Sequence, residues 1–482
     1  MPSSSSLGEL PLVVDLDGTL ITGDTLAESV FVLARRGILN VFRMLYWLTK
    51  GRAVFKSLVA QRVRLNAQLL PYRNPLVEYL RAERRLGRKI VLATAAHASI
   101  AEGVARHLGL FDLVIATSDT VNLKGEKKLA RLRQAVGDRF VYAGDSRADL
   151  PIWRAAQGAI LVDVSSAVAR SVRAAVPVER EIRADGSGWD AWVGALRVHQ
   201  WLKNLLLFVP LFTAFEFSDP EKLASTVLAF IALSLGASAT YIGNDLWDLD
   251  SDRLHPRKRD RPFASGRLPI AHGLACAIAL LLLASVLAVL VTPAFAVALL
   301  AYLVLTTAYS CHFKRYALAD VILLALLYTL RVIAGSGAAS VPVSRWLLAF
   351  SVFSFLSLAL VKRCAELISL RGAGRAITPG RDYRIGDLEV LWPVGISSAM
   401  AAVIVFCMFI SAPETLPRYA TPSLLWLAAV GLIYLFFRLW LVTVRGAMHD
   451  DPLVHLLENR GTLCTLLATA AIIVAAHFIS IF

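Results

Sequence analysis

The sequence contains few cysteines, few charged residues and no recognisable secretion signal. Five of its 482 residues are cysteine, and no two of them form a CxxC pair, so neither a disulfide framework nor a zinc site is indicated. Charged residues make up 18% of the chain, against about 25% in a soluble protein. The first residues lack the basic region and apolar core of a signal peptide, so we expect none. The hydrophobic content of 57% and the low share of charged residues exclude a disordered chain and a single ordinary soluble domain.

Acidic residues are also fewer than basic residues. The chain has 36 acidic and 50 basic residues, which gives a formal net charge of +14. Such a balance indicates anionic partners, whether phosphates, acidic lipids or nucleic acid.

The composition changes near residue 195. Before it, short apolar runs alternate with charged helical stretches, which predicts a parallel sheet with crossover helices. After Arg197 we count nine apolar stretches, each about long enough to cross a bilayer, at residues 201–217, 224–243, 271–291, 293–311, 319–339, 346–361, 390–411, 423–443 and 462–482. We therefore predict an α/β domain at 1–182, a linker at 183–196 and an all-α membrane domain with nine transmembrane helices at 197–482.

Basic residues are concentrated in alternate loops of the second half. One set of loops includes residues 253–267, 314–315 and 362–384, whereas the other set offers only Lys222, Arg345 and Arg418. Because positively charged loops stay in the cytoplasm, we expect a multi-pass protein of the cytoplasmic (inner) membrane, with the N-terminus inside and the C-terminus outside. Basic residues in short loops against a membrane also argue against nucleic-acid binding.

Four polar elements follow one another in the first half. Residues 15–19 read DLDGT and residues 144–149 read GDSRAD, each after an apolar run, and Thr94 ends another run. A cluster of three lysines lies between them, at Lys124, Lys127 and Lys128. Because reactive groups gather at the carboxyl ends of parallel strands, we expect these elements to converge. An ordinary strand followed by a turn would explain DLDGT alone, but not all four elements in this order.

Together these groups fit phosphoryl transfer to a carboxylate. Asp15 would attack phosphorus, and Asp17 would protonate the leaving oxygen and then activate water. Asp145 would help to hold Mg²⁺, Thr94 would donate a hydrogen bond to the phosphate, and a lysine would neutralise it.

Over about residues 10–165 the sequence resembles the haloacid dehalogenase (HAD) superfamily of phosphatases. The resemblance implies that Asp15 is the nucleophile and Asp17 the acid/base. The implied metal ligands are Asp15, Asp17, Asp145 and Asp149. Lys128 has the most natural place for the family's lysine, with Lys124 and Lys127 as alternatives. Residues from about 24 to 70 would form a helical cap, which either lies on a membrane surface or packs Trp47 inward.

Three carboxylates lie where the second predicted membrane helix ends. Asp245, Asp248 and Asp252 stand at positions i, i+3 and i+7, on one face of a helix. Like charges so placed repel one another unless a cation bridges them, and Mg²⁺ takes such oxygen ligands together with water and substrate phosphates. The pattern therefore predicts a diphosphate site, with a solvated helix end as the alternative.

A basic loop follows these carboxylates directly. It contains Arg257, Lys258, Arg259 and Arg261. Alone it would be an ordinary cytoplasmic loop. Beside an acidic metal site, it indicates binding of phosphates beyond those that the metal neutralises.

From about residue 190 to 482 the sequence resembles the UbiA superfamily of intramembrane prenyltransferases. Residues 244–252 match that family's first aspartate motif, NDxxDxxxD, which begins at Asn244. The second acidic motif is incomplete, because Tyr316 stands where an acid would pair with Asp320. Asp320 is nevertheless a candidate metal ligand.

Three segments resemble a narrower branch of that superfamily, decaprenyl-phosphate phosphoribosyltransferase. They are residues 197–204 (RVHQWLKN), 252–262 (DRLHPRKRDRP) and 362–367 (KRCAEL). In that branch a lipid phosphate attacks C1 of phosphoribosyl pyrophosphate and releases pyrophosphate. The resemblance implies that the three aspartates engage Mg²⁺ and the pyrophosphate. The implied phosphate-binding residues are Lys203, Asn244, Arg257, Lys258, Arg259, Arg261, Lys314, Lys362 and Arg363.

The fold we expect is an α/β Rossmann-like HAD domain with a helical cap, followed by an all-α, nine-transmembrane-helix UbiA-type domain. The expected function is transfer of phosphoribose to a polyprenyl phosphate, followed by removal of the 5-phosphate by the HAD domain. Each domain would use one Mg²⁺ site, with Mn²⁺ as a substitute, and assembly of identical chains stays open. The alternatives are a prenyltransferase with an aromatic acceptor and a non-enzymatic transporter with a regulatory domain.

Arg331 lies inside the fifth predicted membrane helix, eleven residues after Asp320. The two residues therefore share roughly one helix face. Arg331 either forms an ion pair with Asp320 or contacts the substrate, and the sequence does not distinguish these alternatives.

Overall fold

The computed structural model describes residues 8–118, 123, 125–183, 188–372, 381–448 and 452–480. By its internal contacts the chain forms two compact units. Unit 1 comprises residues 1–196 and 241–277, and unit 2 comprises residues 197–240 and 278–482. The predicted α/β domain therefore shares a unit with the segment that carries the first aspartate motif. Each unit is described in turn.

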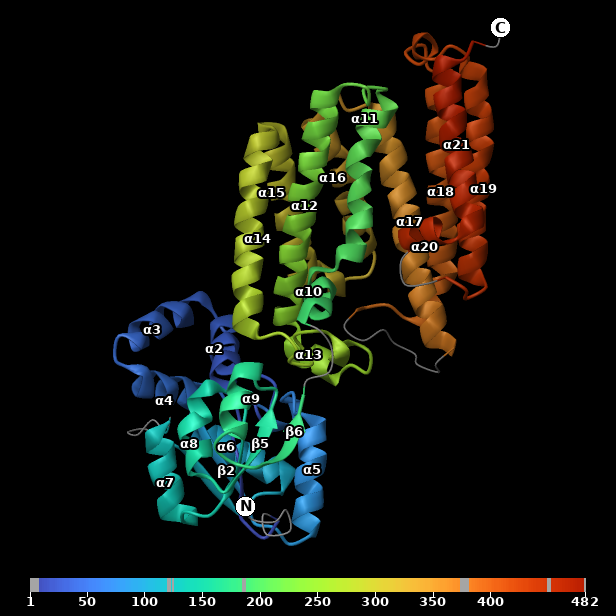
Figure 1. The fold of residues 1–482 in the computed structure, drawn as a ribbon. Helices are drawn as coiled ribbons and strands as arrows, with labels where there is room; N and C mark the ends of the chain where they lie inside the picture. Colours follow the sequence, from blue (N-terminus) through green and yellow to red (C-terminus); the bar gives the residue numbers. More distant parts are fainter. Residues whose placement is uncertain are drawn as a thin grey trace. The chain divides into compact units, whose positions relative to one another are not determined.

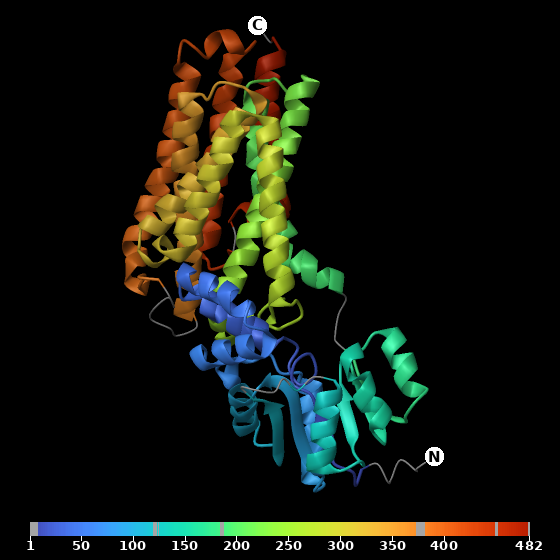
Figure 2. The same cartoon turned by 90° about the vertical axis from the view of Figure 1, so that its left-hand side faces the viewer.

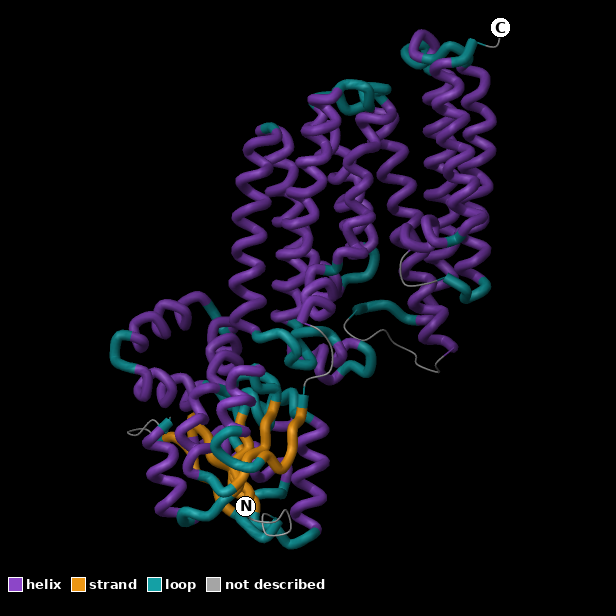
Figure 3. Tube along the Cα trace, in the orientation of Figure 1, coloured by secondary structure: helices purple, strands orange, loops and turns teal. Residues whose placement is uncertain are grey.

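Unit 1 is built on a six-stranded parallel sheet with strand order β3-β2-β1-β4-β5-β6. The strands, orange in Figure 3, are β1 Leu12–Val14, β2 Ile90–His97, β3 Leu113–Thr117, β4 Val141–Gly144, β5 Gly158–Val162 and β6 Val178–Ile182. The chain order reverses between β1 and β4, and ligand sites in open α/β sheets form at such a switch point. The predicted parallel sheet is confirmed, and its last strand, β6, has a polar sequence rather than an apolar run.

Alternation along the strands gives the sheet two apolar faces. Leu12 and Val14 belong to one buried cluster, whereas Val13 and Tyr142 belong to the other. Helices of the α/β domain cover the sheet. They are α5 Asn74–Arg85, α6 Ala98–Leu108, α7 Glu126–Val136, α8 Leu150–Ala155 and α9 Ser166–Arg173. Side chains on both faces are thus removed from water, which fixes the strand register and the loops that follow the strands.

Three helices lie in the segment where we expect the helical cap. They are α2 Thr25–Arg35, α3 Ile38–Leu48 and α4 Arg52–Arg62. Trp47 is buried in a cluster with Leu33, Met44 and Phe55, so the inward packing of this side chain is confirmed. The opposite side of α3 leaves large apolar side chains such as Phe42 exposed.

Two further helices complete unit 1. They are α10 Gly188–Leu196 and α13 Leu249–Leu254. The end of α12 Pro220–Trp247 and the beginning of α14 Ile270–Val291 also belong to this unit.

Unit 2 is a bundle of long apolar helices that run alongside one another (Figures 1 and 2). Besides most of α12 and α14, it contains α15 Pro293–Cys311, α16 Ala319–Ala339, α17 Arg345–Gly372, α18 Leu388–Ser411, α19 Leu425–Val444, α20 Pro452–Glu458 and α21 Arg460–Phe478. Within the described residues, eight helices are long and apolar enough to cross a membrane.

The first predicted membrane segment, 201–217, has a different conformation from the others. It is formed by the 3-10 helix η3 Val198–Phe208 and the short helix α11 Val209–Thr213. Arg197 before it has a positive φ of 51°. The nine predicted segments therefore correspond to eight long helices and this broken one.

Candidate active sites

The DLDGT and GDSRAD motifs lie at neighbouring strand ends in unit 1. Asp15 follows β1 and Asp145 follows β4, and these strands are paired so that Val14 stands opposite Ala143. The backbone N–H of Asp15 donates to the carbonyl of Ala143, at 3.1 Å. Parallel pairing thus brings two carboxylates that are 130 positions apart to one edge of the sheet.

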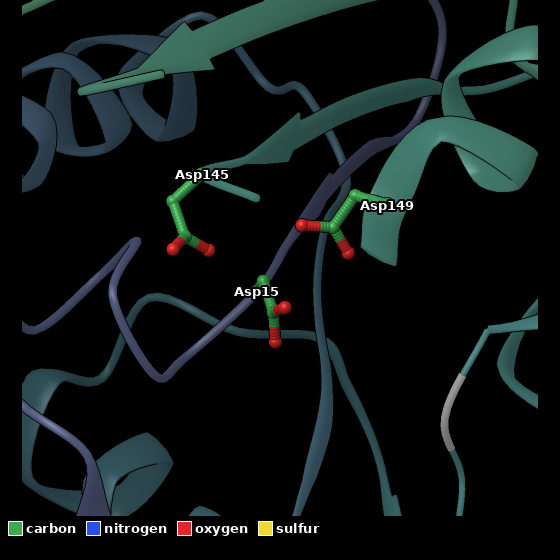
Figure 4. Close-up of side chains that lie close together, drawn as sticks. All are labelled: Asp15, Asp145 and Asp149. Atoms are coloured by element: carbon green, nitrogen blue, oxygen red, sulfur yellow. The ribbon is translucent and has the colours of Figure 1, made fainter. Parts of the chain in front are cut away.

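Asp15, Asp145 and Asp149 form a compact acidic trio. Each offers an oxygen within 4.8 Å of the others, and Figure 4 shows the three carboxyl groups converging. Among the described residues, this is the one such trio that could hold a metal ion. Three carboxylate oxygens are a donor set that Mg²⁺ prefers, so the residues fit the expected cation.

The three carboxylates of the trio carry like charges and repel one another. Burial raises the pKa of Asp15, and the neighbouring Asp149 acts in the same direction while Lys128 opposes it. Burial, together with the charges of Asp149 and Asp15, raises the pKa of Asp145 from 3.8 to about 7. Burial is the main cause of both shifts and the like charge of Asp149 adds to it, whereas a bound divalent cation would lower both pKa values.

Lys128 contacts the predicted nucleophile. It lies in the first turn of α7, is buried, and places Nζ 2.9 Å from Oδ2 of Asp15. Lys127 is exposed, and Lys124 lies outside the described residues. Of the two candidate lysines that the structure describes, Lys128 is therefore the one that contacts Asp15.

Tyr142 is a site residue that the sequence reasoning missed. Its hydroxyl accepts from Nζ of Lys128 at 2.7 Å and donates to Oδ1 of Asp149 at 2.9 Å. Asp15 Oδ2 lies 3.5 Å away. The available signal was a tyrosine in an otherwise apolar strand, two residues before the aspartate-bearing loop.

Asp17 lies outside the acidic trio. Its Oδ1 accepts from the backbone N–H of Thr25 at 2.8 Å, at the start of α2. Burial and the nearby carboxylate of Asp24 raise the pKa of Asp17 to about 7. A carboxyl group with this pKa can give and take a proton near neutral pH, which suits an acid/base better than a metal ligand.

Two residues shape the turn after Asp17. Gly18 has φ +75°, and a side chain there would collide with the carboxylate of Asp145. Arg73, also missed from sequence, is buried and donates to the carbonyl oxygens of Gly18 and Thr19 at 3.1 and 3.3 Å. Thr94 is buried on β2, the other neighbour of β1, where its hydroxyl accepts from the N–H of Ala96 at 2.9 Å.

The first aspartate motif forms a second acidic site in unit 1. Asp245 lies in the last turn of α12 and Asp252 lies in α13, and both are buried. A single nitrogen of Arg261, Nη1, lies 3.0 Å from Asp245 and 2.6 Å from Asp252. Both carboxylates are therefore paired with one guanidinium, and the aspartates of this motif are not among the described groups that lie close enough together to hold a metal ion.

The other predicted residues of this motif are more open. Asp248 is half-buried and precedes α13, and its N–H donates to the carbonyl of Asn244 at 2.8 Å. Lys258 lies 4.0 Å from Asp252. Arg257, Lys258 and Arg259 are exposed, so their side chains are accessible to an anion.

A buried ion pair links α2 to the residue after the motif. Arg253 donates to both carboxylate oxygens of Glu28, at 2.7 and 3.0 Å, and both side chains are at most 7% exposed. Sequence reasoning missed Glu28, because no pattern connects residues 225 positions apart.

Asp320 in unit 2 is engaged by two neighbours. Its oxygens accept from Arg363 and from the hydroxyl of Tyr383, each at 2.5 Å. Arg363 also pairs with Glu366. Both predicted residues thus belong to one buried network. Among the other predicted residues, Lys203 is buried, and Lys314 and Lys362 are half-buried.

Comparison with known proteins follows the division seen in the sequence. Residues 205–454 match the model of the UbiA prenyltransferase family, and residues 12–154 match that of haloacid dehalogenase-like hydrolases. The chain belongs to the UbiA prenyltransferase family. Its expected fold class, with an N-terminal HAD-like domain, is confirmed.

Two curated relatives and one solved structure illustrate the range of this UbiA family member's neighbours. An uncharacterized protein of Sinorhizobium fredii is 38% identical over 94% of this chain and 88% of its own length. A decaprenyl-phosphate phosphoribosyltransferase of Mycobacterium tuberculosis is 34% identical over 44% of this chain and 72% of its own. A UbiA homolog from Archaeoglobus fulgidus, bound to DMAPP and Mg²⁺, is 19% identical with a TM-score of 0.44, covering 60% of this chain and 99% of its own.

The UbiA family member carries two groups of acidic residues. One follows strands β1 and β4, and the other lies in the first aspartate motif. The apolar helices and the family indicate a multi-pass membrane protein, and the two matched domain types indicate an enzyme.

Proposed function

We propose that the chain is a bifunctional membrane enzyme that makes a polyprenyl-phosphoryl ribose in two steps. The domain bounds would be 1–182 for the phosphatase and 197–482 for the transferase, joined by residues 183–196. The observation that carries the proposal is the contact of Lys128 with Asp15 inside an acidic trio. A phosphatase centre of this kind shares one chain with an aspartate motif whose relatives include named phosphoribosyltransferases.

In the first step, an oxygen of a polyprenyl phosphate attacks C1 of phosphoribosyl pyrophosphate. The bond from C1 to the pyrophosphate oxygen breaks, and pyrophosphate leaves. Asp245, Asp248 and Asp252 would hold Mg²⁺, which neutralises the charge that develops on the leaving group. The exposed Arg257, Lys258 and Arg259 would bind the remaining phosphates.

In the second step, Asp15 attacks the phosphorus of the ribose 5-phosphate. Asp17 gives its proton to the leaving 5-oxygen, so the alcohol is released and the phosphoryl group stays on Asp15. Water then attacks this phosphoryl group, Asp17 takes the proton, and inorganic phosphate leaves. Lys128 offsets the negative charge on the transferring group throughout. A magnesium ion at Asp15, Asp145 and Asp149 would allow two anions to approach each other.

Membrane topology belongs to the same proposal. Basic loops in the cytoplasm would place both acidic sites there, with the C-terminus outside the inner membrane. Phosphoribosyl pyrophosphate is a cytoplasmic, water-soluble substrate, so its site has to face that side. Mn²⁺ would substitute for Mg²⁺ at both sites because it takes the same oxygen ligands.

The test uses purified full-length protein with a polyprenyl phosphate, phosphoribosyl pyrophosphate and Mg²⁺, with the lipids read by mass spectrometry. We expect the lipid to gain ribose without its 5-phosphate. In Asp15→Asn it should gain phosphoribose and retain the phosphate. Asp248→Ala should abolish transfer while leaving hydrolysis of a small phosphomonoester intact.

Two outcomes would contradict the proposal. If the Asp15→Asn protein still releases phosphate from the lipid product, the HAD domain does not carry out the second step. An unchanged lipid in the wild type, with an active phosphatase domain, would favour a prenyltransferase that uses an aromatic acceptor.

A further inference from the structure

Arg331 is a buried cation in the middle of α16. Arg331 is 6% exposed, and each of its hydrogen bonds goes to a neutral group. Nε donates to Oδ1 of Asn204 at 3.0 Å, Nη1 to the carbonyl of Leu327 at 2.8 Å, and Nη2 to the hydroxyl of Tyr302 at 3.1 Å. The guanidinium also lies against the rings of Tyr302 and Tyr328, at 4.8 and 5.2 Å from the ring centroids.

The structure gives Arg331 no carboxylate partner among the described residues of the chain. The acid on its own helix, Asp320, is bound by Arg363 and Tyr383 instead. An ionised side chain inside a membrane is costly unless it is paired, and such residues generally mark functional sites. Tyrosine faces and neutral acceptors offset a part of this cost, but they leave a net positive charge inside the bundle.

The surroundings hold the guanidinium in one orientation. Asn204 donates through Nδ2 to the hydroxyl of Ser234 at 3.0 Å, so its carbonyl oxygen faces Arg331. The bond from Nη1 to Leu327, four residues earlier, directs the guanidinium toward the beginning of α16, the end that carries Asp320. Asn204, Ser234 and Tyr302 are all buried. These contacts hold the guanidinium of Arg331 in a fixed position inside the protein, unlike the mobile side chain of a surface arginine.

Donor groups are left over at this site. An arginine has five N–H groups, and three are used here. Tyr302 accepts from Arg331, which leaves its own O–H free to donate. Along α16 the eleven residues from Asp320 to Arg331 correspond to roughly 16 Å of helix, so an anion bound at Arg331 lies well inside the apolar bundle.

We propose that Arg331, Asn204 and Tyr302 form an anion site inside unit 2 that takes the phosphate of a polyprenyl phosphate. This inference rests on the proposed function, because it names the lipid substrate of that reaction. A single phosphate attached to a long apolar chain can reach such a depth, since the surrounding helices solvate the chain. A free sugar phosphate would have to lose its water without that compensation.

The test measures lipid binding by full-length protein in detergent, using native mass spectrometry. The probes are a polyprenyl phosphate, the polyprenol without phosphate, inorganic phosphate and phosphoribosyl pyrophosphate. Arg331→Gln should weaken binding of the polyprenyl phosphate at least tenfold and leave binding of the polyprenol unchanged. Arg331→Lys should lose less, because it keeps the charge. Tyr302→Phe should weaken phosphate binding several-fold while it preserves the ring against the guanidinium.

Arg438 on α19 offers a matched control. It too is held by a tyrosine hydroxyl and an asparagine oxygen, with Nη1 2.8 Å from Tyr434 and Nη2 3.1 Å from Asn459. It is only half-buried. Arg438→Gln should leave binding of both lipids unchanged.

Three outcomes would overturn the inference. Unchanged affinity of Arg331→Gln for the polyprenyl phosphate would show that no phosphate binds there. Equal losses for the phosphate and the alcohol would show a structural role. A loss confined to inorganic phosphate or phosphoribosyl pyrophosphate would assign the site to a soluble anion. If the wild type binds the lipid through Arg331 but transfers no phosphoribose, the proposed function fails while this inference stands.

Discussion

At the scale of single residues, Tyr142 connects the groups of the proposed phosphatase centre. One hydroxyl contacts the lysine, the predicted nucleophile and a member of the acidic trio. Burial and the neighbouring carboxylates raise the pKa of Tyr142 far above its usual value. The phenol is therefore protonated at neutral pH, where it donates a hydrogen bond to Asp149.

We expect Tyr142→Phe to lower kcat of the phosphatase about tenfold, the effect of losing one hydrogen bond to a charged group. The ring should keep its edge contact with Trp153, whose centroid lies 6.0 Å away, so the Tm should change little. Measuring kcat, KM and Tm on a small phosphomonoester separates these effects. A fall in Tm with normal kcat would show that Tyr142 only packs.

The lysine cluster offers a second test at this scale. Lys128→Met should reduce phosphatase activity by two or more orders of magnitude, because it removes the charge that faces the transferring phosphate. Lys127→Met, one position away and exposed, is the control and should retain wild-type activity. Comparable losses in both variants would contradict the role of Lys128.

The sequence narrowed this lysine to three candidates and favoured Lys128, but it could not exclude Lys124 and Lys127. The choice depends on where α7 begins and on which side of that helix faces the sheet. The first turn of α7 directs Lys128 inward and leaves Lys127 in solvent. Tyr142, Arg73 and Glu28 were missed because their roles come from contacts between distant segments.

At the scale of elements, α2 serves two neighbours. Its first N–H, from Thr25, binds Asp17, and Glu28 one turn later binds Arg253. Glu28→Gln would leave the guanidinium of Arg253 buried without its partner, and we expect a loss of roughly 3–5 kcal/mol in the free energy of unfolding. Thermal unfolding of the full chain should show this as a clear fall in Tm.

A second ion pair of α2 is the control for this prediction. Arg35 and Asp250 lie 3.5 Å apart, and Asp250 is 52% exposed, so Asp250→Asn should cost less than about 1 kcal/mol. The double variant Glu28→Leu/Arg253→Met should recover most of the stability, because apolar side chains of similar size can replace a buried pair. A double variant as unstable as the sum of the single ones would show that the two residues act independently.

Two elements departed from expectation for physical reasons. Strand β6 reads VEREI, and its polar residues hide an edge strand from a search for apolar runs. Segment 201–217 has an apolar composition, but Lys203 and Asn204 are buried in it and Pro210 interrupts it. Hydropathy detects apolar content, and it does not detect the 3-10 conformation that these residues adopt.

At the scale of the whole molecule, fold class and domain order were predictable because each half has its own pattern of apolar residues and its own sequence motif. Alternating strands and helices define one half, and apolar stretches of membrane length define the other. The choice of partners within unit 2 was not predictable. Asp320 and Arg331 share a helix face, yet Asp320 pairs with Arg363 on another helix.

Topology provides a prediction for the whole chain. Alkaline phosphatase fused to the C-terminus should be active, because this enzyme folds only outside the cytoplasm, whereas fusions after Arg315 should be inactive. The reason is the concentration of basic loops on one side. Activity in both fusions, or in neither, would contradict the proposed orientation. A fusion in the loop after Ser340 is the internal control and should be active.

The double use of α2 also constrains how such sequences can change. A helix advances about 100° per residue, so one inserted or deleted residue between Thr25 and Glu28 would rotate the acid away from Arg253 while the amide still faced Asp17. Substitutions can accumulate at this turn, but changes of length cannot. Natural relatives that keep both domains on one chain should therefore preserve a spacing of three residues here, even where the rest of the cap varies in length.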